Sequence, residues 1–122
     1  MKTSKKTSRI KTIDAIGRTL GRVASEAASF LIGKTSVKFE RHIYSGFQVT
    51  VVNASKLSIT PKKLAEIYHT RYSGMPGGLH VLSGSQTALK KGFKELIRLA
   101  IYRMLPANKL KNKMMKNLKI EN

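Results

Sequence analysis

The chain has 122 residues, of which 24 are lysine or arginine and six are aspartate or glutamate, so its formal net charge is +18 at pH 7. A small folded domain with this charge repels itself unless a partner neutralises it, which indicates a polyanionic partner, most commonly nucleic acid. The chain contains no cysteine, which excludes a disulfide-stabilised scaffold and gives no sign of an oxidising compartment.

Length and charge pattern predict one domain preceded by a short basic tail. We assign residues 1–12 to the tail and residues 13–122 to a single domain. The tail lacks the apolar run of a signal peptide, and no stretch approaches the roughly 18 apolar residues that would span a membrane. We therefore expect a cytoplasmic protein with no membrane partner. A basic, acid-poor start is also compatible with an organelle transit peptide, so an organellar origin stays open beside a bacterial one.

The first half of the domain shows the pattern of a parallel α/β unit. Apolar residues alternate over Ile10–Ile16, as in a short strand, and then recur at helical spacing from Thr19, the expected N-cap, to Gly33, the expected end. The β-branched run Val49–Val52 predicts a strand buried on both faces. The order strand, helix, strand implies a parallel pair joined by a right-handed crossover.

A short helix and a glycine-rich loop are expected next. Thr60 followed by Pro61 is typical of a helix start, so we predict a helix over Lys62–Tyr68 with Lys62 and Lys63 on its exposed face. The segment Ser73–Gly78 contains three glycines and a proline, which predicts an irregular loop able to approach another backbone closely.

The second half of the chain is predominantly helical in pattern. Gly92 is expected to separate a short helix, beginning near Ser85 or Thr87, from a longer one. The longer helix has an apolar stripe formed by Phe93, Leu96, Ile97, Ala100, Ile101 and Met104.

Pro106 is expected to end that helix, and Asn108 is expected to cap a last one. The last helix has one apolar face and an opposite face rich in lysine. Its apolar face consists of Leu110, Met114 and Leu118, and its basic face of Lys109, Lys111, Lys113 and Lys116. The segment Leu118–Ile120 is also compatible with a final strand.

Five motifs in order and register resemble the uL13 family of large-subunit ribosomal proteins, bacterial type. They are Asp14-Ala15 with Leu20-Gly21-Arg22-Val23-Ala24-Ser25, Gly33-Lys34, Val51-Val52-Asn53-Ala54, Tyr72-Ser73-Gly74-Met75-Pro76-Gly77-Gly78-Leu79, and Met104-Leu105-Pro106-Ala107-Asn108. The chain departs from the family pattern at several positions, Tyr72 and Met75 among them, and stops soon after Ile120, as expected of a compact, divergent member.

The resemblance implies a fold and a function. The expected fold is a three-layer α/β/α domain around a four-stranded parallel sheet. The expected function is that of a structural constituent of the large ribosomal subunit, which binds large-subunit rRNA of the 23S type, supports subunit assembly and contacts neighbouring large-subunit proteins. No catalytic residue, cofactor, metal or small-molecule substrate is implied.

The candidate RNA-binding residues are the basic side chains of exposed segments and the residues of the glycine loop. Lysine and arginine neutralise phosphates with release of counterions, whereas arginine and tyrosine also stack on unpaired bases. The candidates are Lys2, Lys5, Lys6, Arg9, Lys11, Arg18, Arg22, Lys34, Lys38, Arg41, Lys62, Lys63, His69, Arg71, Tyr72, Ser73, Gly77, Gly78, His80, Lys109, Lys111, Lys113 and Lys116.

Two other classes of function remain as alternatives. An RNA-directed enzyme would use His42, His69 or His80 for acid–base chemistry, but the sequence has neither clustered metal-binding carboxylates nor a phosphate-binding loop ending in Gly-Lys-Ser/Thr. A regulatory RNA- or DNA-binding module acting off the ribosome is compatible with the charge. However, no helix-turn-helix, zinc-finger or RNA-recognition aromatic motif is recognisable.

Overall fold

The computed structural model describes residues 9–122 of the chain. Its elements in chain order are β1 (Ile10–Asp14), α1 (Leu20–Ile32), β2 (Gln48–Val52), the 3-10 turn η1 (Ala54–Lys56), α2 (Pro61–Glu66), β3 (Tyr68–Tyr72), β4 (Leu79–Ser83), α3 (Gly84–Lys91), α4 (Phe93–Met104), α5 (Lys111–Lys116) and β5 (Leu118–Ile120).

The main sheet has the strand order β1-β2-β5, with both pairs parallel. The predicted β1–α1–β2 unit is therefore confirmed as a parallel pair, and the chain returns to the sheet at Leu118–Ile120. Because β1 starts at Ile10, the last residues of the predicted tail lie in the sheet. Over residues 9–122 this sheet contains three strands, so the expectation of four parallel strands is wrong for this part of the chain.

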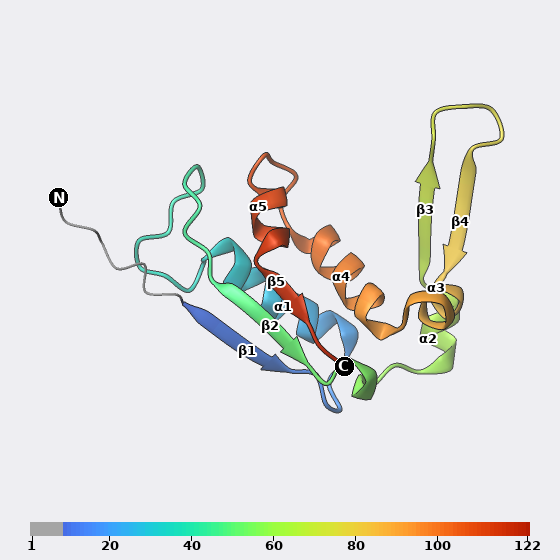
Figure 1. Ribbon diagram of the computed structural model, residues 1–122, viewed down its shortest axis with the longest axis horizontal. Coiled ribbons are helices and arrows are strands. Elements are labelled where there is room, and N and C mark those ends of the chain that lie inside the picture. The colour runs from blue at the N-terminus through green and yellow to red at the C-terminus, as the bar shows by residue number, and fades with distance from the viewer. Residues whose placement is uncertain (1–8) are drawn as a thin grey trace.

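Helices cover only one face of the sheet. Ile13, Val49 and Val51 alternate onto the buried face and join one core cluster with residues from α1, α4 and α5. The opposite face carries polar side chains such as Thr12 and Lys119, both exposed, and Figure 1 shows the sheet in front of α1. The predicted three-layer sandwich and the strand buried on both faces are thus not seen in the described residues.

The ends of α1 follow local rules. Thr19 occupies the N-cap position, although its side chain makes no capping hydrogen bond. Gly33 adopts the left-handed conformation (φ 87°), and its N–H donates to the carbonyl oxygens of Ser29 and Phe30. A Cβ at Gly33 would also lie 3.0 Å from the Ser45 carbonyl oxygen. Glycine is therefore required here both by the backbone and by the close approach of the next segment.

The largest departure from expectation is an antiparallel β3–β4 hairpin. Thr60 caps α2 as predicted, accepting from the Lys63 N–H, but α2 ends at Glu66, and Tyr68 begins a strand. β3 pairs with β4 in a separate two-stranded sheet, and the glycine loop connects the two strands. Figure 1 shows this hairpin projecting from the end of the molecule near α2 and α3. Aromatic and β-branched residues occupy alternate positions of Tyr68–Tyr72, a pattern that favours a strand and ends the helix before it.

The C-terminal helices are close to their predicted bounds. Ser83 caps α3 in a capping box with Gln86, and Gly92 (φ 77°) separates α3 from α4. The expected Asn108 cap is wrong, because Leu110 holds the N-cap position of α5 and the Asn108 carbonyl accepts from the Lys111 N–H. α5 ends at Lys116, which places Leu118 in β5 rather than on the helix.

Candidate nucleic-acid interface

Few of the described basic side chains are neutralised within the chain. Of the lysines and arginines in residues 9–122, only Arg18 and Arg98 pair with a carboxylate, at 2.5 Å from Glu26 and 2.7 Å from Glu95. Arg18 is thus held by an internal ion pair, whereas the candidate Arg22 is exposed on the first turn of α1. The remaining cations are spread over many elements, among them the α1–β2 connection, α2, α3 and the region of α5.

The hairpin has two chemically different faces. In an antiparallel pair, residues directly opposite each other point to the same face. Arg71 opposes His80 on one face, and Tyr72 opposes Leu79 on the other, with Thr70 and Val81 next to them. The sequence places Arg71 and Tyr72 side by side, but the structure turns them to opposite faces. A basic face and an uncharged, largely apolar face therefore share one hairpin.

The loop at the tip of the hairpin is a tight turn. The Ser73 N–H donates to the Gly78 carbonyl oxygen at 3.3 Å, and the Gly78 N–H donates to the Met75 carbonyl oxygen at 3.0 Å. Gly77 has φ 76°, a conformation that favours glycine. The candidate residues Ser73, Gly77 and Gly78 therefore shape the turn that presents Arg71 and His80.

His69 differs from the other candidate residues of the hairpin. It is half-buried at the base, and neither ring nitrogen has a hydrogen-bond partner within residues 9–122. Burial, reinforced by the positive charge of Arg103, lowers the pKa of His69 below its ordinary value of 6.5. Arg103 also donates to the Tyr68 carbonyl oxygen at 3.2 Å. These observations favour a neutral His69 at the base of the hairpin rather than a phosphate contact.

A second basic region surrounds the long connection between α1 and β2. It carries Lys34, Lys38 and Arg41, all exposed. Lys11 Nζ lies 5.6 Å from the centre of the Phe30 ring, and Arg9 lies 5.6 Å from that of Phe47. In Figure 1 this connection, the turn between α4 and α5, and the hairpin all extend to the upper edge of the view.

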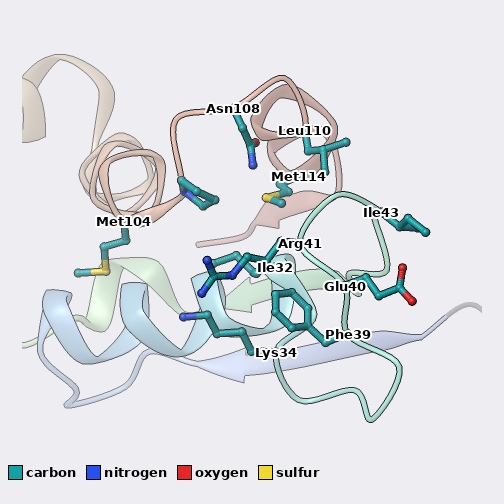
Figure 2. A pocket seen from close by; sticks show the side chains of 11 residues that line it. Ile32, Lys34, Phe39, Glu40, Arg41, Ile43, Met104, Asn108, Leu110 and Met114 are labelled. Carbon is teal, nitrogen blue, oxygen red and sulfur yellow. The ribbon is translucent and has the colours of Figure 1, made fainter.

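The turn before α5 forms one wall of a pocket, and the α1–β2 connection forms the other. The pocket has a volume of about 380 Å³. Figure 2 shows that side chains from both segments point into the space between them. Its lining consists of Ile32, Lys34, Phe39, Glu40, Arg41, Ile43, Met104, Pro106, Asn108, Leu110 and Met114. Sequence reasoning selected Lys34 and Arg41 but missed Phe39 and Asn108, because the two walls are distant in sequence.

The remaining candidates lie on short helices. Lys62 and Lys63 are exposed on α2, and Lys109, Lys113 and Lys116 are exposed on and before α5. Lys111 differs, since it is half-buried and its Nζ lies 3.7 Å from the centre of the Tyr102 ring. Lys2, Lys5 and Lys6 lie outside the described residues.

The carboxylates of the described residues are few and dispersed. Within residues 9–122, no group of three or more His, Cys, Asp or Glu residues is placed to hold a metal ion. Asp14 accepts hydrogen bonds from the Ile16 N–H and the Asn53 Nδ2, both at 3.1 Å, and these bonds lower its pKa. The carboxylate therefore stabilises the turn after β1.

No helix in the described residues is long and apolar enough to cross a membrane.

A mixed α/β domain with many exposed cations that form no ion pair within residues 9–122 is typical of the class of basic nucleic-acid-binding proteins. Comparison with known proteins narrows this class. Residues 8–120 match the family model described as ribosomal protein L13. The large ribosomal subunit protein uL13 of Natranaerobius thermophilus is 44% identical over 109 residues, covering 89% of this chain and 76% of the relative. The uL13 of Thermotoga petrophila is 44% identical over 108 residues, covering 88% and 72%. The chain belongs to the uL13 ribosomal protein family.

Proposed function

We propose that the protein is a structural constituent of the large ribosomal subunit, where it binds large-subunit rRNA and supports subunit assembly. Its relatives are named as large-subunit proteins, and the match extends over nearly the whole chain. The observation that carries the binding role is the set of exposed cations that form no ion pair within residues 9–122, among them Lys34, Lys38 and Arg41 on the α1–β2 connection, Arg71 on the hairpin, and Lys113 and Lys116 on α5. These segments hold RNA phosphates, and the role is positional rather than catalytic.

The mode of recognition follows from the kinds of side chain that are exposed. Lysine and arginine contacts to phosphate supply affinity without reading base sequence. Arg71 and His80 on the hairpin, with Lys34 and Arg41 on the connection, are separate points of contact. Multiple contacts at separated points select a folded RNA by its shape. The proposal also includes contacts with neighbouring large-subunit proteins and a location on the cytoplasmic ribosome.

Two measurements test the function. In sucrose-gradient sedimentation of cell extract, the protein is expected to travel with the large subunit, whereas a regulatory module would remain in the light fractions. Binding to protein-free large-subunit rRNA is expected to weaken steeply with salt. With about eight phosphate contacts, the slope of log affinity against log salt is about −6 to −7. A slope shallower than about −2 would contradict the proposed mode of binding.

A further inference from the structure

The pocket between the α1–β2 connection and the α4–α5 turn combines an apolar interior with a basic rim. Its volume of about 380 Å³ falls in the range of roughly 300–1,000 Å³ that is typical of small-molecule sites. Met114 is buried in the interior, while Phe39 and Leu110 are half-buried. Phe39 therefore offers part of its ring to the pocket. A flat group can lie on this ring while the aliphatic side chains enclose it.

The rim adds positive charge at one side. Lys34 and Arg41 are exposed, and neither forms an ion pair with any residue in 9–122. Figure 2 shows both side chains extending to the same side of the view, and both line the same pocket as Phe39. Glu40 also lines the pocket, but its carboxylate lies 3.3 Å from His42 Nε2. In Figure 2 Glu40 points away from Lys34 and Arg41, which leaves the two cations for an anion.

This combination fits a nucleotide better than it fits an amino-acid side chain. A nucleobase has apolar faces that stack on aromatic rings, a polar edge, and an attached phosphate. Asn108 brings an amide to the lining, a group that can both donate to and accept from a base edge. An apolar side chain from a neighbouring protein would fill the interior but leave Lys34 and Arg41 without a counter-charge.

We propose that this pocket receives one unstacked nucleotide of RNA, whose base stacks on Phe39 and whose phosphate lies between Lys34 and Arg41. The proposal rests on the proposed rRNA-binding function and assigns it a specific site. The rest of the basic surface contacts phosphates of folded RNA without requiring that any base be extruded. The pocket adds a single anchoring nucleotide that fixes the position of the protein on that RNA.

The first test separates stacking from packing by substitution at Phe39, with protein-free large-subunit rRNA as the probe. Phe39→Tyr keeps an aromatic ring and is expected to bind within about two-fold of the unsubstituted chain. Phe39→Leu keeps an apolar group of similar size and is expected to weaken binding by about 5- to 150-fold, the range for losing one stacked base. Equal affinity of the Leu and Tyr variants would overturn the proposal. Circular dichroism checks that both variants fold.

The second test identifies the occupant inside the particle. A photoreactive benzoylphenylalanine replaces Met104, a 45% exposed residue of the pocket lining, in purified large subunits. The matched control replaces Leu89, which is 87% exposed on α3, outside the pocket. We expect the Met104 probe to crosslink to one rRNA position that the Leu89 probe does not reach. Crosslinking to a protein, or no crosslink, would overturn the nucleotide proposal.

The two proposals fail in different ways. If the chain sediments with the large subunit and retains its steep salt dependence, the proposed function stands even where the Phe39 and Met104 tests give the opposing results. If the chain remains in the light fractions, the proposed function fails, whatever the Phe39 variants do with purified rRNA.

Discussion

The β1–α1–β2 unit and the β3–β4 hairpin are opposite in construction. In the first, Val23, Leu31, Val49 and Val51 are completely buried. In the hairpin, Tyr72 is 65% exposed and Leu79 60% exposed. A two-stranded hairpin is marginally stable on its own in water. Folding free energy is therefore concentrated in the buried β1–α1–β2 unit, whereas the hairpin leaves large apolar side chains exposed.

The largest expected effect comes from the core. Ile97 of α4 is completely buried in the cluster that joins α1, α4 and the sheet. Ile97→Ala leaves a cavity and is expected to lower the free energy of unfolding by about 2–5 kcal/mol. Val81→Ala on the hairpin, where the side chain is 50% exposed, is the matched control and is expected to cost less than about 0.5 kcal/mol. Urea unfolding measures both values. Equal losses would remove the distinction between the buried core, to which the β1–α1–β2 unit belongs, and the exposed hairpin.

The second largest effect is expected on RNA binding, where substitutions on the two faces of the hairpin should differ. Arg71→Ala removes a cation from the basic face and is expected to weaken binding to protein-free large-subunit rRNA, while the salt slope becomes shallower by about 0.7–0.9. Leu79→Ser, on the opposite face, removes no counterion-releasing group and is expected to leave the slope unchanged. Filter binding across a salt series measures the slopes. The distinction between the faces would be wrong if Leu79→Ser changed the slope as much as Arg71→Ala.

The same two regions show how far the sequence could predict the structure. The α1 helix, its Gly33 end and the parallel pairing of β1 with β2 follow from local spacing and the order of elements, and all three were predictable. The hairpin was not predicted, because the Thr60-Pro61 helix start suggested a helix reaching Tyr68. In the structure that helix ends at Glu66, and the strand pattern of Tyr68–Tyr72 begins β3. The open sheet face depends on which helices pack where, and residue types alone do not decide this.

The candidate site was predictable by composition but not by geometry. Exposed lysines and arginines were identified from the sequence because charged side chains rarely lie in a core. Their grouping was not, since Arg71 and Tyr72 turn to opposite faces of the hairpin and Arg18 pairs with Glu26. The pocket is lined by Phe39 on one side and by Asn108 and Met114 on the other, and no local pattern connects segments so distant in the chain.

The smallest expected effect concerns pH and the base of the hairpin. Burial lowers the pKa of His69, and within the described residues the charged groups that act on it are Arg103, which lowers the pKa further, and Glu95, which raises it. A depressed pKa means that the folded state binds fewer protons than the unfolded state. The stabilising contribution is therefore present above the ordinary value of 6.5 and is lost as the pH falls below it.

The melting temperature is accordingly expected to fall when the pH is lowered from 7.5 to 5.5. The His69→Phe variant is expected to show a smaller fall. One proton limits the effect to about 1.4 kcal/mol per pH unit. His80→Gln, at an exposed position of the same hairpin, controls for the loss of an imidazole. Differential scanning fluorimetry at the two pH values provides the comparison. A fall of the same size in His69→Phe would show that protonation of His69 does not cause the pH dependence.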